Sequence, residues 1–259
     1  MIKIWSEGPS GDGMSEAVLV ESLALVRAHP WWHARARLAI SLLEAEGLSA
    51  PCSIIDIGCG WGVNLQALES AGYRASGLDA SKEILELIDQ PQRALFLADL
   101  TQPLLAEHET YDGGLMLDVL EHLDDDRASL NRVADLLRPG GSLIVSVPAL
   151  PELFSEYDEI QGHRRRYTAE ALRAAFDGTG LRLKHIYWWG AWMVRVLKAT
   201  RKKQRSAESA PKTYAQYLRL PPWPVPWAMR ALHAIENWHP VLSRLTTGTS
   251  LIAVATREG

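Results

Sequence analysis

The sequence predicts an α/β protein built around a parallel sheet, and three observations support this class. Residues 54–57 form a short apolar run that is typical of a buried strand. A turn with glycine at every second position follows, and then a helix with Leu65 and Leu68 on its inward face. Two later apolar runs, 73–79 and 93–99, each end in an acidic residue. Strand, glycine turn and helix together form the first half of a nucleotide-binding βαβ unit.

The composition is that of an ordinary globular protein. A chain of 259 residues can bury a sizeable core as one elaborated domain. The net charge of −4 gives no indication of a nucleic-acid partner, and two cysteines provide no disulfide framework. The sequence shows neither a leader-like start nor an apolar run long enough to span a membrane. The expected location is therefore cytoplasmic.

We expect a single domain over 1–259 with four parts: an N-terminal helical lid (1–48), a ligand-binding core (49–189), a helical insertion (190–246) and a final strand (247–259). Ser15 can cap the first helix of the lid, and Pro30 separates it from the second. An arginine on the second helix could pair with a ligand carboxylate. We favour Arg37 over Arg35 for this role; the alternative is that both belong to a solvated face.

The glycine turn has the pattern G-x-G-x-G, with Gly58, Gly60 and Gly62. Dinucleotide sites instead carry G-x-G-x-x-G. Asp56 directly precedes the turn, and an acid is a poor neighbour for a pyrophosphate. The turn therefore favours a ligand with a cationic part, which glycines allow to approach the backbone closely.

The acids at the strand ends are candidate ligand contacts. Asp79 lies about twenty residues beyond the glycine turn, where nucleotide-binding folds place a carboxylate on the ribose hydroxyls. A helix-capping role is the alternative. Asp99 ends the third strand, and a plain surface acid is its competing interpretation.

The fourth strand, 111–117, should lie beside the first, at the switch point where open α/β sheets bind ligands. His122 follows on its exit loop. A histidine there can accept a proton from a substrate hydroxyl, since its unperturbed pKa lies near neutrality. The alternative is that His122 only caps or packs the turn.

These motifs resemble one enzyme class when they are taken together and in order. The run D-I-G-C-G-x-G at 56–62 resembles motif I of class I S-adenosyl-L-methionine (SAM) methyltransferases. V-L-E-H at 119–122 resembles their "E-V-L-E-H" segment, although Asp118 stands where glutamate is usual. L-R-P-G-G at 137–141 resembles the turn before their fifth strand. The resemblance covers roughly 31–188 plus the last strand, and it is strongest to ubiquinone-biosynthesis type O-methyltransferases.

The resemblance implies a Rossmann-like sheet of seven strands, with the last strand antiparallel between the fifth and sixth. It also implies SAM as cofactor and no metal. Asp79 would hold the ribose, Asp99 and Leu100 would lie beside the adenine, and the backbone of Leu117 would meet the amino-acid end. The full set of expected cofactor-binding residues is Arg37, Asp56, Gly58, Gly60, Gly62, Asp79, Ala80, Asp99, Leu100 and Leu117.

The acceptor should bind near the segment 153–167, which has no clean periodicity and is dense in charged and aromatic residues. The segment resembles a "D-x-x-x-G-H-x-R-R-Y-T" block of bacterial methyltransferases. The expected acceptor-binding residues are Tyr157, His163, Arg166 and Tyr167. The alternative is that the arginines only pair with acids of the same loop.

The insertion combines basic residues with tryptophan. Between Gly190 and Arg230 there are nine Lys or Arg and one acid, Glu208. Such a segment can lie on a membrane surface or cover a greasy acceptor. We favour a folded lid, and we keep peripheral contact with the inner membrane face through 190–230 as an expectation.

The function that these features predict is SAM-dependent methyl transfer to a small apolar or aromatic acceptor, with oxygen as the favoured atom and His122 as catalytic base. N- or C-methylation of a metabolite or lipid-linked acceptor is one alternative. A non-catalytic SAM-binding protein that docks a partner through the insertion is the other.

Overall fold

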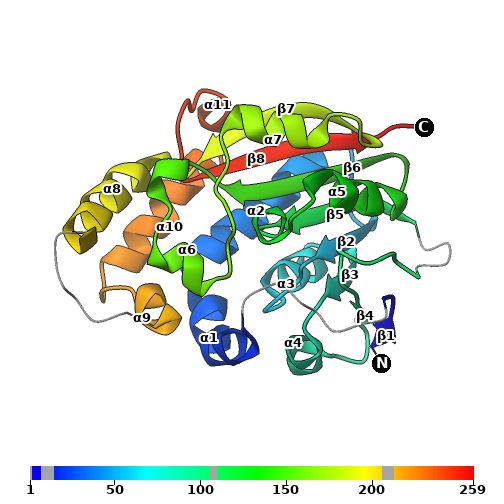
Figure 1. Ribbon diagram of the computed structural model, residues 1–259, viewed down its shortest axis with the longest axis horizontal. Helices are drawn as coiled ribbons and strands as arrows, with labels where there is room; N and C mark the ends of the chain where they lie inside the picture. Colours follow the sequence, from blue (N-terminus) through cyan, green and yellow to red (C-terminus); the bar gives the residue numbers. More distant parts are fainter. Residues whose placement is uncertain (1, 7–14, 106–109, 206–212) are drawn as a thin grey trace.

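The computed structural model describes residues 2–6, 15–105, 110–205 and 213–259. Its centre is one mixed sheet with the strand order β1-β4-β3-β2-β5-β6-β8-β7 (Figure 1). Strand β8 is antiparallel to β6 and β7, and the other pairings are parallel. The bounds are β1 Lys3–Ile4, β2 Ser53–Ile57, β3 Arg74–Asp79, β4 Ala94–Leu97, β5 Tyr111–Leu117, β6 Leu137–Pro148, β7 Leu181–Trp189 and β8 Ser250–Arg257. The predicted α/β class and the antiparallel last strand are confirmed.

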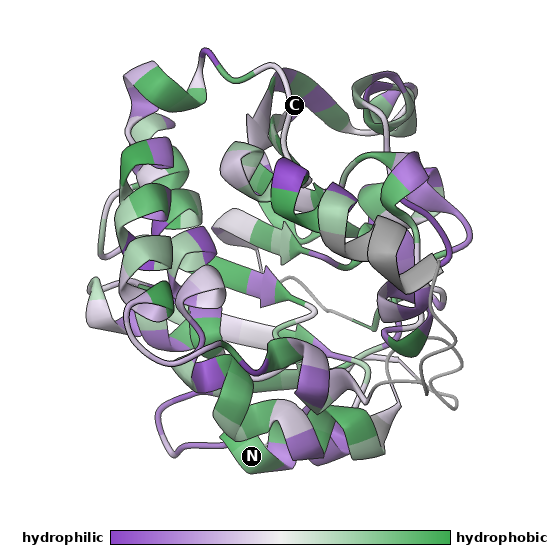
Figure 2. Ribbon diagram, turned by 90° about the vertical axis from the view of Figure 1, so that its left-hand side faces the viewer, coloured by the Kyte–Doolittle hydropathy of each residue, from purple (hydrophilic) through white to green (hydrophobic). Residues whose placement is uncertain are grey.

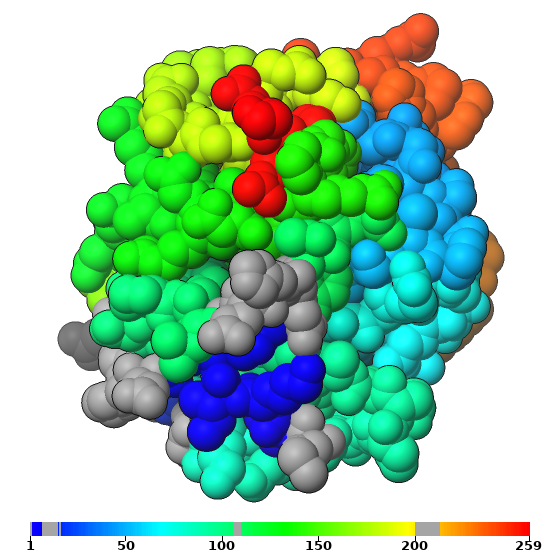
Figure 3. Space-filling view, turned by 90° about the vertical axis from the view of Figure 1, so that its right-hand side faces the viewer, coloured from blue at the N-terminus to red at the C-terminus, as the bar shows by residue number. Residues whose placement is uncertain are grey.

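The sheet has eight described strands where seven were expected, because β1 adds a short parallel edge beside β4. Trp5 follows β1, is 5% exposed and stacks on Phe96 with ring centroids 3.6 Å apart. Figure 3 shows the N-terminal residues, in blue, at the surface of the molecule. A two-residue strand is too short to show a period-two pattern, so the sequence could not predict it.

Helices cover both faces of the sheet. On one face α2 (Pro30–Ala45), α3 (Val63–Ser70) and α11 (His239–Leu242) contribute to one apolar cluster. On the other face α5 (Asp126–Asp135) and α7 (Ala169–Phe176) contribute to the largest one. Because both faces are covered, the central strands read as continuous apolar runs, as parallel strands usually do.

The two N-terminal helices begin as their caps predict. Ser15 accepts a hydrogen bond from the backbone of Val18 at the start of α1 (Glu16–Ala28). Pro30 is the first residue of α2, where its missing N–H costs nothing. The His29 ring caps the same helix by accepting from Trp31 N at 3.2 Å.

The helices that will concern the site gather at one end of the sheet, on the left of Figure 1. They are α1, α6 (Glu156–Ile160), α8 (Ala191–Arg205), α9 (Tyr214–Leu218) and α10 (Val225–Glu236). Figure 2 faces this end and shows hydrophobic and hydrophilic residues mixed along its helices. Helix α6 lies within the segment expected to be a loop. Among the described helices, none is both long and apolar enough to cross a membrane.

Candidate active site

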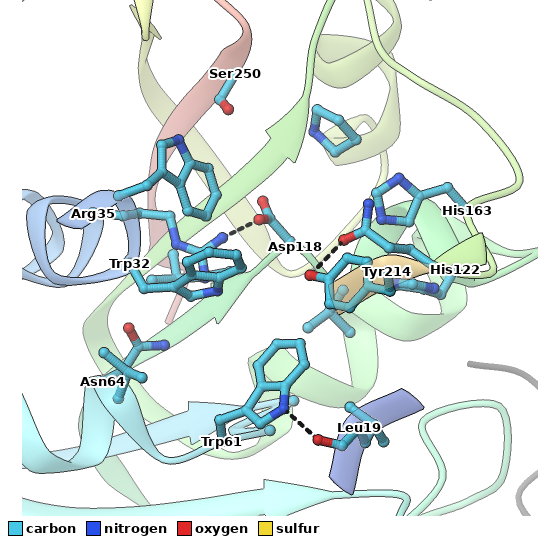
Figure 4. Close-up of a pocket in the computed structure, with 18 of the residues that line it drawn as sticks. Leu19, Trp32, Arg35, Trp61, Asn64, Asp118, His122, His163, Tyr214 and Ser250 are labelled. Carbon is cyan, nitrogen blue, oxygen red and sulfur yellow. Dashed lines mark hydrogen bonds and ion pairs between the residues drawn. The ribbon is translucent and has the colours of Figure 1, made fainter. Parts of the chain in front are cut away.

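A cavity of about 580 Å³ opens at the carboxyl ends of β2, β3, β4 and β5 (Figure 4). Most of the site residues expected from the sequence line it: Gly58, Gly60, Asp79, Ala80, Asp99, Leu100, Leu117, His122, Tyr157, His163 and Arg166. Arg37, Asp56, Gly62 and Tyr167 do not. The carboxyl ends of neighbouring parallel strands meet at one edge, which explains how residues far apart in sequence converge.

The glycine turn is shaped for close approach. Gly58 and Gly60 have φ of 69° and 45°, in the left-handed region that glycine tolerates. A Cβ on Gly58 would lie 2.3 Å from Val119 Cγ2, whereas a Cβ on Gly60 would have only Gly58 O within 4 Å, at 3.9 Å. Gly60 therefore presents bare backbone to the cavity. Gly62 is the N-cap of α3 in the left-handed conformation, and a Cβ there would lie 3.4 Å from Ile88 Cγ2.

Asp79 ties the turn to the end of β3. One of its carboxylate oxygens accepts from Gly60 N at 2.8 Å and the other from Ser81 N at 2.9 Å. Each oxygen keeps a further lone pair for a ligand hydroxyl. Burial raises the pKa of this carboxyl, and the backbone donors oppose that shift.

Asp56 lies beneath the turn and does not reach the cavity. Its side chain is fully buried, and Oδ1 accepts from Asn64 Nδ2 at 3.1 Å. Burial raises the pKa of Asp56 to about 7. Asp56 therefore does not line the cavity; Asn64, which donates to Asp56, does.

Arg35, and not Arg37, reaches the site from α2. Arg35 is 5% exposed, forms an ion pair with Asp118 and lies over the Trp31 ring at 4.5 Å. Arg37 is exposed, because a shift of two residues turns a helical side chain by about 200°. The sequence held one signal: Arg35 follows Trp31 by four residues and so shares its face.

Asp118 is a site residue to which the sequence analysis assigned no role. It lines the cavity at φ 57°, which is uncommon for a residue with a side chain. Ser146 Oγ donates to its Oδ1 at 2.8 Å, and Arg35 engages its other oxygen. Arg35 Nε has no hydrogen-bond partner within the described chain, which leaves a buried donor for a ligand carboxylate.

His122 lies on the 3-10 turn Leu120–His122 after β5 and faces His163, with ring centroids 4.8 Å apart. Burial lowers the pKa of His122 to about 4, and the neighbouring His163 adds to the shift. The imidazole is therefore neutral at pH 7 and keeps a lone pair that can accept a proton. Glu121, also overlooked from the sequence, is fully buried beside these rings.

Arginine side chains of the segment 153–167 hold that segment in place as well as lining the cavity. Arg166 lines the cavity, and it also donates to Asp158 Oδ1 at 2.6 Å and to Ala149 O at 2.9 Å. Tyr167 is buried and donates to Leu120 O at 3.2 Å, so its expected acceptor contact is not supported. The alternative in which arginines hold this loop is therefore correct for the Arg166–Asp158 pair.

An aromatic wall, which no local sequence pattern predicts, completes the cavity. Trp32 comes from α2, Trp61 from the glycine turn and Tyr214 from α9 (Figure 4). Trp61 and Tyr214 are nearly parallel, with centroids 6.4 Å apart. Trp61 Nε1 donates to Leu19 O at 2.8 Å, which ties this wall to α1.

Comparison with known families matches residues 31–186 to a family described as a methyltransferase domain. The chain belongs to this family, the SAM-dependent methyltransferases. Among curated relatives, the ubiquinone biosynthesis O-methyltransferase of Aromatoleum aromaticum is 26% identical over 134 residues, 46% of this chain and 57% of that protein. The chain spans about half the length of the curated relatives it matches.

Solved structures share the fold. A chain of a complex that contains the Haloferax volcanii Trm112 methyltransferase activator has a TM-score of 0.61 at 18% identity, over 94% of this chain and 96% of that one. Haemonchus contortus phosphoethanolamine N-methyltransferase 2, in complex with SAM, gives 0.52 at 15% identity, over 86% and 52%. The cofactor of this family is SAM, and the bare backbone at Gly60 and the free Arg35 donor fit it.

Proposed function

We propose that this chain transfers the methyl group of SAM to an oxygen of a small apolar or aromatic acceptor. One observation carries the proposal: a neutral, half-buried His122 shares one cavity with Asp79 and Arg35, and an aromatic wall encloses it. A base is needed for a hydroxyl acceptor, whose proton must leave. A neutral amine acceptor does not need a base to remove its proton before it attacks the methyl group.

The residues divide the work along the cavity. Bound SAM supplies an activated methyl group on a sulfonium. In this proposal Asp79 accepts from the ribose hydroxyls, Asp99 and Leu100 lie beside the adenine, and Arg35 pairs with the carboxylate. All four residues line the cavity, which supports these roles. His122 would receive the acceptor's proton, while the surrounding side chains would exclude water and hold the reacting groups in line.

The insertion adds apolar side chains to the cavity lining, namely Met193, Leu197, Leu218, Leu220 and Met229. A hydrophobic phenol or a molecule with an apolar tail is therefore the acceptor class that this lining supports.

The test is formation of S-adenosylhomocysteine from SAM with panels of hydrophobic phenols, aliphatic alcohols and amines. We expect turnover with hydroxyl acceptors and a product whose new methyl group lies on oxygen. Turnover restricted to amines or to carbon acceptors would replace the proposal by its first alternative. SAM binding without turnover on any of these classes would favour the partner-docking alternative.

We further propose that the acceptor is met at a membrane surface through the insertion. Trp227 on α10 is 65% exposed, and Trp223 and Trp238, which lie before and after the helix, are 82% and 65% exposed. Ile235 on the same helix is 58% exposed. Arg230 is exposed on the same helix, and its one acid, Glu236, is buried. Tryptophan and arginine together favour an anionic lipid interface. The side chains of the basic run 201–205 lie outside the described residues.

A further inference from the structure

The segment 153–167 gives the cavity a polar corner. Figure 4 shows His163 beside His122 on one side of the cavity, and Arg35 and Trp32 on the other. The residues of the segment that line the cavity are Ser155, Tyr157, Gln161, His163 and Arg166. Arg166 is the one Asp, Glu, Lys or Arg among them, so its guanidinium determines the charge of this corner.

Two hydrogen bonds hold the Arg166 guanidinium and leave most of its donors unused. The side chain is 5% exposed. Nε donates to Asp158 Oδ1 at 2.6 Å, and Nη1 donates to Ala149 O at 2.9 Å. A guanidinium carries five N–H donors, so three remain after these two bonds. No group of the described chain accepts from Nη2, and the side chain lines the cavity. The unused donors are therefore available to a molecule bound there.

Asp158 fixes the position of Arg166 relative to the proposed base. Asp158 is fully buried, and its Oδ2 accepts from Ser155 N at 2.9 Å and from Ser155 Oγ at 3.1 Å. Nδ1 of His163 lies 3.3 Å from Oδ1, the oxygen to which Arg166 also donates. The His163 ring in turn faces His122, with centroids 4.8 Å apart. The unused edge of Arg166 is therefore held close to the place where the acceptor hydroxyl is expected.

The charges around this corner favour an anionic ligand group. A guanidinium with free N–H donors binds carboxylates in bidentate geometry. Burial raises the pKa of the Glu121 carboxyl well above its usual value, which favours the neutral form. Burial lowers the pKa of His122 to about 4, so its ring is also neutral at pH 7. Asp118, which lines the cavity, forms an ion pair with Arg35.

We propose that Arg166 binds a carboxylate of the acceptor, which is then a hydroxy acid with an apolar body. This inference rests on the proposed oxygen methylation and names the acceptor class more closely. The hydroxyl faces His122, the carboxylate pairs with Arg166, and the apolar body packs against the Met and Leu side chains of the insertion. Methyl transfer forms the O–CH₃ bond at the hydroxyl and breaks the S–CH₃ bond to give S-adenosylhomocysteine. His122 takes the hydroxyl proton, and the carboxylate is unchanged.

Acceptor binding without turnover tests the carboxylate contact. The full-length protein is saturated with S-adenosylhomocysteine, and calorimetry measures its affinity for hydroxybenzoates and hydroxynaphthoates. Each acid is paired with the phenol or naphthol that lacks the carboxylate, and the ring position of the carboxylate is varied to cover different spacings. We expect the best hydroxy acid to bind roughly tenfold or more tightly than its neutral partner, because hydrogen bonds between charged groups are stronger than those between neutral ones.

Arg166→Gln should remove this preference, so that the acid and its neutral partner bind with about equal affinity. The ratio of the two affinities is the decisive readout, because purely structural damage weakens both ligands alike. Arg165→Gln is the matched control and should keep the preference, since Arg165 does not line the cavity and donates to Leu123 O at 2.6 Å. If the single variant does not fold, Asp158→Asn with Arg166→Gln removes both buried charges together. SAM binding by each variant establishes that it is folded.

The carboxylate contact and the proposed function fail separately. If no hydroxy acid binds wild type more tightly than its neutral partner, or if a folded Arg166 variant keeps the preference, the inference is overturned and oxygen methylation of phenols stands. A methyl ester as product also overturns the inference, because the carboxylate would then lie at the methyl group and not at Arg166. If Arg166 selects hydroxy acids but their hydroxyl is never methylated, the carboxylate site stands and the proposed function falls.

Discussion

At the scale of single residues, Arg35 is the clearest test of how the cofactor is held. Arg35→Ala should weaken SAM binding by about 1.5–3 kcal/mol, the range for hydrogen bonds to charged groups. Its partner Asp118 is 26% exposed, so the lost ion pair leaves no fully buried charge. Calorimetric titration with SAM measures the change, and Arg37→Ala on the exposed face of the same helix is the control. If the two variants bind SAM with equal affinity, Arg35 does not contact the cofactor.

His122 belongs to the same scale, and its prediction concerns rate. His122→Ala should lower kcat by roughly 10²–10⁴, which is the usual effect of losing a general base. The affinity for SAM should change little. Because burial depresses the pKa of His122 to about 4, the wild-type rate should not fall as pH drops through 6.5. The pH–rate profile with a hydroxyl acceptor tests this; an inflection near 6.5 would place the titrating imidazole elsewhere.

At the scale of elements, α10 presents apolar side chains on two sides. Met229 belongs to the cavity lining, while Trp227 is exposed, as is Trp238 just after the helix. If the outer face meets lipid, the double substitution Trp227→Ser and Trp238→Ser should reduce binding to anionic vesicles by at least tenfold, about 1.4 kcal/mol, with SAM affinity intact. Co-sedimentation measures this. Leu87→Ser on α4 (Lys82–Ile88), which removes a 46%-exposed apolar residue elsewhere, is the control. If the wild-type protein does not bind vesicles even at low salt, the insertion is better described as a lid over a soluble acceptor.

At the scale of the whole molecule, buried carboxyls at the sheet end should make stability depend on pH. The pKa of Asp56 is raised to about 7 in the fold, so its stabilising effect is present at acid pH and is lost as pH rises through 7. Asp56→Asn keeps the oxygen that accepts from Asn64 but cannot ionise. Relative to wild type, the variant should gain roughly 3 kcal/mol of unfolding free energy between pH 5 and pH 8. Urea unfolding at both values measures it; a pH-independent difference would contradict the assignment.

Most of the fold could be predicted from the sequence, because hydrophobic runs, caps and glycine turns are local signals. Asp79 and Asp99 were predictable for the same reason, since a strand end fixes the place of the residue that follows it. Arg35, Trp61 and Tyr214 were not, because their places depend on how α1, α2 and α9 pack across the sheet end. Glu121 looked like part of a familiar motif, and only the structure shows that its carboxylate is buried without a hydrogen-bond partner among the described residues.

The position of β8 has a consequence for the order of folding. Among the described strands, β7 pairs only with β8, and β8 follows the whole insertion in the chain. The first strands can therefore assemble from near neighbours, but β7 must wait until residues 190–249 have been made and β8 has been brought round to it. Such long-range closure slows folding and leaves the edge of β6 open in the meantime. During synthesis, the strands that carry the glycine turn can thus form before the insertion closes over the cavity.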